Sequence, residues 1–196
     1  MSDQPIDSGK RTWIIASSCA GVVGAGFAAV PFVSSFEPSE RARAAGAPVE
    51  ADISRLAPGE MQIVEWRGKP VWILRRTKEM LDAVKAADDK VADPNSEVDK
   101  QPDYAKNEFR SVKPEILVLV GICTHLGCSP QPKSAEAKGE MGADWGGGFL
   151  CPCHGSKFDL AGRVYKGSPA PVNLDVPPYT YVSDGTILIG EDKKGA

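Results

Sequence analysis

Two short segments contain most of the side chains in this chain that could bind a soft metal. They read Cys-Thr-His-Leu-Gly-Cys at residues 123–128 and Cys-Pro-Cys-His-Gly-Ser at residues 151–156, and they hold four of the five cysteines and both histidines. Each segment therefore offers a thiolate and an imidazole at close spacing. Two thiolates and two imidazoles make a four-ligand site for a thiophilic metal, so we interpret the segments as one metal site and not as scattered core residues.

Two kinds of metal centre use such ligands. A zinc ion would take the first cysteine and the histidine of each segment in a tetrahedral site, which leaves Cys128 and Cys153 without a role. A 2Fe–2S cluster would take two cysteines on one iron and two histidines on the other. Neutral imidazoles make such a cluster less negative than four thiolates do, so an added electron is better tolerated. The ligand types alone leave both centres open.

The two segments resemble the C-x-H-x-G-C and C-P-C-H-G-S boxes of the Rieske iron–sulfur proteins. The resemblance implies one 2Fe–2S cluster. Its implied ligands are Cys123 and Cys151 through sulfur, and His125 and His154 through nitrogen. The resemblance also gives the remaining cysteines of the two segments a role, because Cys128 and Cys153 would form a disulfide that joins the two loops.

Such a disulfide indicates which group of Rieske proteins the chain resembles and in which compartment the head lies. On the chain-entropy model a bridge over this span stabilises the folded state by roughly 3–4 kcal/mol, and it requires an oxidising environment. Respiratory and photosynthetic Rieske proteins have the two extra cysteines, whereas Rieske ferredoxins and the Rieske domains of ring-hydroxylating oxygenases generally lack them. The chain therefore resembles the respiratory and photosynthetic group.

The resemblance also assigns roles to residues beside the ligands. Ser156 resembles the family serine whose hydroxyl donates a hydrogen bond to a bridging sulfide. Phe158 stands where the family often has a tyrosine that bonds a ligand sulfur, so we expect a lower reduction potential than in tyrosine-bearing relatives. Leu126 and Gly127 at the tip of the first box, and Pro169 in a segment that resembles the family's Pro loop, would dock on the quinol-binding subunit.

The composition fits a loop-rich protein with more strand than helix, since the 196 residues include 20 glycines and 16 prolines. The length suits one ordinary domain with an appendage. The net charge is −3, so nothing in the charge balance suggests nucleic-acid binding.

A long apolar run precedes the rest of the chain. Residues 12–36 carry no charged side chain, and about 20 apolar residues suffice to span a bilayer, so we expect one transmembrane helix here. The run is longer than the apolar part of a typical cleaved signal, which favours an uncleaved anchor. Lys10 and Arg11 precede it and predict a cytoplasmic N-terminus over residues 1–11. Residues 8–14 also resemble a twin-arginine export signal with lysine in the first arginine position.

A linker and one head follow the apolar run. Residues 37–48 contain no large apolar side chain, and a segment with nothing to bury does not pack firmly, so we expect a hinge, as in the Rieske family. The head comprises residues 49–196. We expect a mainly β fold: a Rieske-type antiparallel β-sandwich with an inserted cluster-binding subdomain at about residues 115–171.

Alternating apolar residues and turn signals predict the elements of the head. In order they are a hairpin of 61–66 with 69–75, a helix over 77–85 capped by Thr77, a surface excursion over 86–112, a buried strand at 115–120, an external loop at 129–147, a strand at 148–150, a hairpin of 158–159 with 163–165, the Pro loop at 167–171, and a last hairpin of 179–182 with 187–189.

The resemblance implies the Rieske subunit of a ubiquinol–cytochrome c reductase, the cytochrome bc1 complex, of proteobacterial type. Such a subunit takes an electron and a proton from ubiquinol at the outer quinol-oxidation site through His154 and His125. It passes the electron to a c-type cytochrome and so contributes to proton translocation. The implied partners are cytochrome b and cytochrome c1 in a dimeric complex, with the head on the periplasmic side of the bacterial inner membrane. The alternatives are the small subunit of an arsenite-oxidase-like enzyme, which would need no lasting anchor or hinge, and a membrane-tethered zinc module.

Overall fold

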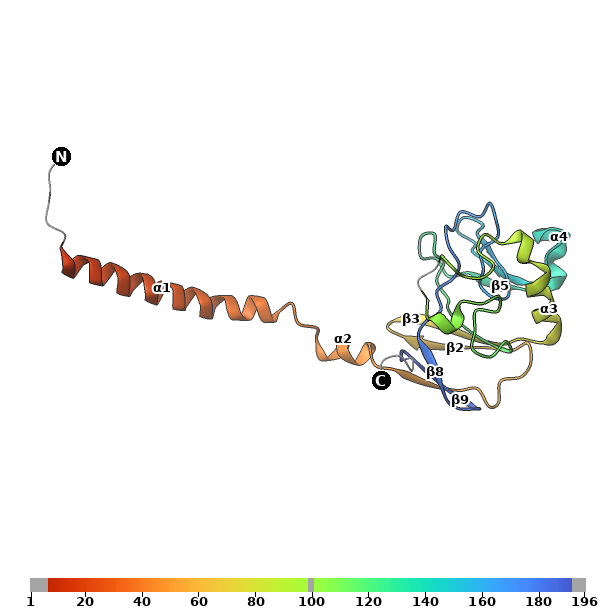
Figure 1. The fold of residues 1–196 in the computed structure, drawn as a ribbon, viewed down its shortest axis with the longest axis horizontal. Helices are drawn as coiled ribbons and strands as arrows, with labels where there is room; N and C mark the ends of the chain where they lie inside the picture. The colour runs from red at the N-terminus through yellow and green to blue at the C-terminus, as the bar shows by residue number, and fades with distance from the viewer. Residues whose placement is uncertain (1–6, 99–100, 192–196) are drawn as a thin grey trace. The chain divides into compact units, whose positions relative to one another are not determined.

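The computed structural model describes residues 7–98 and 101–191, and the chain divides into two units, Met1–Ala44 and Ala45–Ala196. The first unit is dominated by the helix α1, Ser8–Ser34 (Figure 1). Asp7 caps α1, because its carboxylate accepts the backbone N–H groups of Gly9 and Lys10 at 3.0 and 3.2 Å. By length and composition α1 could cross a membrane, which confirms the apolar helix expected from the sequence, although it begins and ends earlier than residues 12–36.

The linker region has more structure than its composition suggests. The short helix α2, Glu40–Ala45, lies within residues 37–48. The hydroxyl of Ser39 accepts the backbone N–H of Ala42 at 3.2 Å, a local hydrogen bond that needs no burial. The boundary between the two units falls at the end of α2. The hinge role of residues 37–48 remains a prediction.

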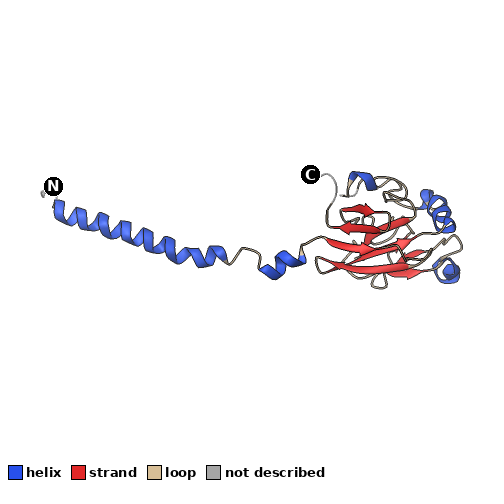
Figure 2. Cartoon of the chain, turned by 90° about the horizontal axis from the view of Figure 1, so that it is seen from below, coloured by secondary structure: helices blue, strands red, loops and turns tan. Residues whose placement is uncertain are grey.

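The described part of the head contains three antiparallel sheets, each of three strands, and Figure 2 shows the head's helices at its edges. The first sheet has the order β1-β9-β8, the second β2-β3-β4 and the third β5-β6-β7. The strands are β1 Val49–Asp52, β2 Met61–Trp66, β3 Lys69–Arg75, β4 Ile116–Val120, β5 Gln131–Lys133, β6 Gly148–Leu150, β7 Lys157–Phe158, β8 Tyr179–Ser183 and β9 Thr186–Ile189. Because β1 pairs with β9, the first sheet joins the two ends of the head and the third sheet is an insertion. The expected mainly β architecture is confirmed.

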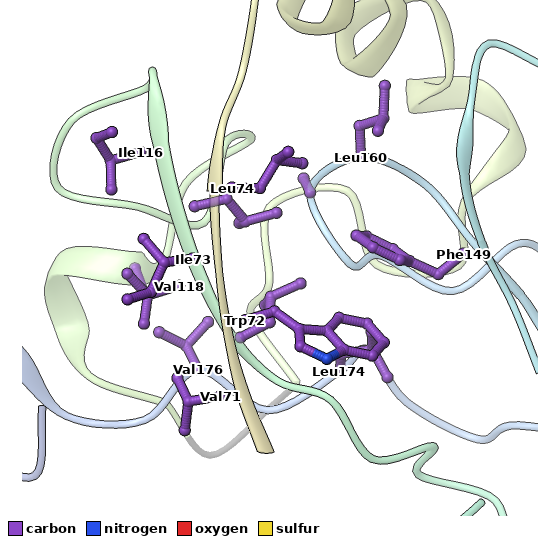
Figure 3. Close-up of a cluster of buried hydrophobic side chains, with 14 of the residues drawn as sticks. Val71, Trp72, Ile73, Leu74, Ile116, Val118, Phe149, Leu160, Leu174 and Val176 are labelled. Atoms are coloured by element: carbon purple, nitrogen blue, oxygen red, sulfur yellow. The ribbon is translucent and has the colours of Figure 1, made fainter. Parts of the chain in front are cut away.

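One hydrophobic core connects the sheets, and β3 and β4 form its centre (Figure 3). All five residues of β4 are buried, and so are residues 71–74 of β3. This explains why both strands read as continuous apolar runs in the sequence. The predicted hairpin of β2 and β3 is confirmed. Its two-residue turn places Arg67 and Gly68 at φ 53° and 69°, the left-handed conformation that such turns require.

The other predicted elements of the head are confirmed in outline. The helix α3, Lys78–Ala86, has Thr77 as its N-cap, and the Thr77 hydroxyl accepts the backbone N–H of Met80 at 3.3 Å. The final hairpin is β8 with β9. After β7 the chain returns through an isolated bridge between Phe158 and Val164.

The prediction of a surface excursion over residues 86–112 is wrong. Arg110 is fully buried in this stretch, together with Ser96 and Ala105. The Arg110 guanidinium donates to the backbone carbonyls of Ala161 and Gly162 at 3.2 and 3.3 Å. An apolar pattern cannot reveal a segment that is held by a buried arginine, because the burial rests on polar contacts. The stretch also forms two 3₁₀ turns, η1 Asp88–Lys90 and η2 Asp103–Ala105.

The prediction of an external loop over residues 129–147 is also wrong in part. Strand β5 pairs with β6, and the stretch continues through the 3₁₀ turn η3, Ala135–Ala137, and the short helix α4, Lys138–Met141. Trp145 is 3% exposed, and its indole N–H donates to the carbonyl of Ser134 at 3.0 Å. Met141 is buried as well, and the ring of Trp145 lies 5.7 Å from that of Tyr165, so this largely polar segment packs against the head.

Candidate metal centre

The two cysteine–histidine segments form matching loops. The first follows the end of β4, and the second begins directly after β6. In each loop the first residue donates its N–H to the carbonyl of the sixth residue and accepts the N–H of the fifth. In the first loop, the N–H of Cys123 donates to the carbonyl of Cys128 at 2.7 Å and the N–H of Gly127 to the carbonyl of Cys123 at 3.0 Å. In the second, the N–H of Cys151 donates to the carbonyl of Ser156 at 2.8 Å and the N–H of Gly155 to the carbonyl of Cys151 at 2.9 Å. Gly127 and Gly155 have φ of 84° and 76°, so glycine is the residue that the turn demands.

A pair of buried free thiols lies at the base of the loops. Cys123 and Cys151 are each 2% exposed, and neither forms a disulfide. Burial raises the pKa of the Cys123 thiol, and the adjacent Cys151 thiol raises it further. The backbone N–H of His125 and the hydroxyl of Ser156 donate toward the same sulfur and act in the opposite direction. The same two donors would stabilise negative charge on that sulfur in a metal-bound state.

The expected disulfide is confirmed. Cys128 and Cys153 are joined with an S–S distance of 2.06 Å, and the bond connects one loop to the other. The Cys151 sulfur lies close by, since the sulfurs of these three cysteines are within 4.8 Å of one another. A disulfide sulfur cannot serve as a thiolate ligand, so Cys123 and Cys151 are the thiols of the two loops that could bind a metal.

The two histidines lie together at the exposed end of the loops. Their ring centroids are 4.7 Å apart, and the rings are nearly perpendicular. His154 is exposed, whereas His125 is half-buried and its Nδ1 is buried without a hydrogen-bond partner. A buried nitrogen without a partner is costly, and a metal bond would satisfy it. This orphaned nitrogen and the two buried thiols fit the donor set of a 2Fe–2S cluster bound by two cysteines and two histidines.

The segment that resembles a Pro loop, residues 167–171, and the residue directly after it form hydrogen bonds to the two metal-binding loops. The Ser156 hydroxyl accepts the backbone N–H of Ala170 at 3.0 Å, which orients its proton toward the Cys123 sulfur. On the first loop, the Thr124 hydroxyl donates to the carbonyl of Val172 at 2.7 Å. The sequence interpretation missed Thr124, although its position between a cysteine and a histidine is a signal that could have been used.

The residues expected to dock on a partner are exposed at this end of the head. The Leu126 side chain is 71% exposed, and Gly127 and Pro169 are also exposed. An apolar side chain with this exposure beside the histidines is available to a partner surface. The docking role itself remains a prediction.

Comparisons with known proteins identify the family. Residues 97–179, which include both loops, match the family described as "Rieske [2Fe-2S] domain", and residues 13–39 match "Ubiquitinol-cytochrome C reductase Fe-S subunit TAT signal". The ubiquinol-cytochrome c reductase iron-sulfur subunit of Allochromatium vinosum is 59% identical over 95% of this chain and 90% of its own length. The chain belongs to this family of Rieske iron–sulfur subunits. The subunit of Bradyrhizobium diazoefficiens is 44% identical over 90% of each chain.

A solved structure named "Hyperthermophilic respiratory Complex III" matches 88% of this chain and 97% of its own, with 29% identity and a TM-score of 0.46. The family assignment rests on the sequence relatives. A Rieske subunit carries a [2Fe-2S] domain, so the predicted cluster is confirmed and the zinc alternative is not supported. The assignment of individual ligands stays a prediction.

The disulfide of this Rieske subunit should contribute strongly to stability. We expect the double variant Cys128→Ala/Cys153→Ala to lose about 3.5 kcal/mol of unfolding free energy, because the two cysteines are 25 positions apart and the open loop regains entropy in the unfolded chain. Denaturant unfolding of the full chain in detergent measures the loss. Cys19→Ala, which removes an exposed free cysteine in α1, is the control. Equal stability of the two variants would contradict the prediction.

Phe158 offers a test of how the head tunes its cluster. It is fully buried and pairs in register with Phe149 of β6. We expect Phe158→Tyr to raise the reduction potential, because a new hydroxyl donor to a ligand sulfur favours the reduced cluster. If the hydroxyl stabilised the reduced cluster over the oxidised one by about 1.4 kcal/mol, the one-electron reduction potential would rise by about 59 mV. Film voltammetry measures the shift, and an unchanged or lower potential would refute this role.

Proposed function

We propose that this Rieske subunit takes an electron and a proton from ubiquinol and passes the electron to a c-type cytochrome. The arrangement that carries the proposal is the pair of loops, which holds two buried free thiols below two adjacent imidazoles. In this assignment Cys123 and Cys151 would bind one iron, and His125 and His154 would bind the other. The bound cluster supplies one-electron redox chemistry at the exposed end of the head.

The histidines can also hold the proton. An imidazole that binds iron through one nitrogen keeps the other for a proton. Nδ1 of His125 is buried and without a hydrogen-bond partner, so it is the nitrogen that would bind iron, and the other ring nitrogen would remain for a hydrogen bond to substrate. His154 is the more exposed ring, so it is the better candidate to accept a quinol hydroxyl hydrogen bond and its proton. Leu126, Gly127 and Pro169 would form the apolar contact around this end.

The remaining parts of the chain fit a head that is tethered to a membrane. Helix α1 would anchor the subunit where quinol is dissolved, with Lys10 and Arg11 on the cytoplasmic side and the head in the periplasm. A disulfide needs such an oxidising compartment. Residues 37–48 would let the head move between cytochrome b, whose haem takes the second quinol electron, and cytochrome c1, in a dimeric complex. The match of residues 13–39 to a TAT signal supports export of the folded head.

The proton role predicts a pH-dependent reduction potential. The reduced site is more negative, so it holds an imidazole proton that the oxidised site releases as pH rises. The potential should therefore fall with rising pH, by about 59 mV per pH unit where one proton accompanies one electron. Voltammetry of the purified subunit across neutral and alkaline pH measures the slope. A reduction potential that stays constant up to strongly alkaline pH would contradict the proton role of the histidines.

Membership of the complex can be tested by purification from membranes. An affinity tag after residue 196 should retain cytochrome b and cytochrome c1 together with quinol-dependent reduction of cytochrome c. Recovery of the tagged chain with the large subunit of an arsenite-oxidase-like enzyme in place of cytochrome b would instead support that alternative.

A further inference from the structure

The two metal-binding loops begin on strands of different sheets, so something must set the distance between them. Cys123 follows β4 of the second sheet, and Cys151 follows β6 of the third. The side chain of Trp72, from β3, packs against the ring of Phe149, from β6 (Figure 3). The two ring centroids are 4.9 Å apart and the planes are inclined by 27°, a stacked pair. Phe149 lies two residues before Cys151, so the indole contacts the strand that leads into the second loop.

The same indole contacts the chain that leads into the first loop. Gly121 lies two residues before Cys123, and a Cβ at this glycine would lie 2.3 Å from Cε2, 2.4 Å from Nε1 and 2.7 Å from Cζ2 of Trp72. These distances are far below van der Waals contact, so the backbone rests directly on the indole. The N–H of Gly121 donates to the carbonyl of Pro70 at 2.8 Å, which fixes this backbone to β3 as well. Glycine is therefore required here by close approach.

We propose that Trp72 is a positioning residue that sets the separation of the two thiolate ligands. The inference rests on the proposed assignment of Cys123 and Cys151 as those ligands. Trp72 is 4% exposed, and its indole contacts both Gly121 and Phe149, so a change at the indole affects the chain that leads into each loop. Protein interiors are close-packed and respond to the loss of even small volumes. A smaller side chain at position 72 changes the distance between the loops and so distorts the metal site.

Trp66 provides a matched control within the same sheet. It is a tryptophan of β2, is 7% exposed, and also lies against a glycine, since a Cβ at Gly190 would lie 2.5 Å from its Nε1. Gly190 directly follows β9 of the first sheet, whereas Gly121 precedes the first metal-binding loop, so the glycine that Trp66 contacts does not lead into a metal-binding loop. If Trp72 served only to fill the core, Trp66→Phe should change the cluster as much as Trp72→Phe does.

The experiment uses the full chain, purified in detergent, as wild type, Trp72→Phe and Trp66→Phe. We expect Trp72→Phe to shift the EPR g values and the reduction potential and to lose iron to a chelator about tenfold faster, the scale of changes in residues that orient metal ligands. We expect Trp66→Phe to keep the wild-type g values, potential and rate of iron loss. Equal spectra, potentials and rates for the two variants would overturn the inference.

A second pair of variants keeps the test decisive if Trp72→Phe folds poorly. Gly121→Ala places a methyl group against the indole and should displace the first loop, whereas adding Trp72→Leu removes the three indole atoms that the methyl group meets. The double variant should then have g values closer to wild type than Gly121→Ala alone, a non-additive result expected of residues in contact. Additive changes would contradict the inference. Absence of a cluster in the wild-type chain would instead refute the ligand assignment, which separates the two failures.

Discussion

Replacement of Cys151 by serine should abolish the cluster and, with it, quinol oxidation by the complex. Cys151 is a buried free thiol beside Cys123, and its loop is closed by backbone hydrogen bonds that do not depend on the side chain. A serine hydroxyl keeps the size of the side chain but is a poor substitute for a soft thiolate at iron. We therefore expect complete loss of visible absorption and EPR signal in a chain that still folds.

The matched control for this variant is Cys19→Ser. Cys19 is also a free cysteine, but it is exposed on α1, outside the head. Iron content, absorption and turnover of the Cys19→Ser variant should equal those of the wild type. A Cys151→Ser variant that retains a full complement of iron, or a Cys19→Ser variant that loses it, would contradict the ligand assignment.

Replacement of Arg163 by methionine should be the most destabilising single change in the head. Arg163 is fully buried, and its Nε donates to the Asp159 carboxylate at 2.7 Å. Its Nη1 forms a second ion pair with Asp88 at 2.6 Å. Asp159 is 1% exposed, so Arg163→Met leaves a buried carboxylate without its cation. Removal of one partner of such a pair costs about 3–5 kcal/mol, which denaturant unfolding measures.

The control for Arg163 is an ion pair of the same i,i+4 spacing at the surface. Lys78 and Asp82 are 2.9 Å apart, but their side chains are 83% and 60% exposed. Lys78→Met should leave the free energy of unfolding nearly unchanged, because solvent already screens this pair. Equal losses of unfolding free energy for Lys78→Met and Arg163→Met would contradict the prediction that the buried Arg163 pair is the more stabilising one.

The sequence was informative wherever structure follows from apolar patterning. The run Ile116–Val120 predicted a buried strand, and Arg67 with Gly68 predicted the turn of the first hairpin. The two boxes identified the site because both histidines and most of the cysteines gather there. In each case the signal lies within a short run of residues.

The sequence failed where burial depends on contacts between distant residues. Arg110 reads as a surface residue, yet it is fully buried because it donates to carbonyls of residues 161 and 162. Trp145, in a stretch that reads as an external loop, is buried, and its ring lies 5.7 Å from that of Tyr165. Gly121 reads as an ordinary glycine before the first box, and only the structure shows the indole of Trp72 against it. Such pairings are set by tertiary packing and leave no periodic pattern.

Low-temperature EPR of the reduced, purified full chain is the most direct test of the account. A 2Fe–2S cluster with two nitrogen ligands should give a signal with an average g value below 2, together with visible absorption in the oxidised protein. A colourless protein that contains zinc, or one in which Cys128 and Cys153 are separate free thiols in the native state, would contradict the account.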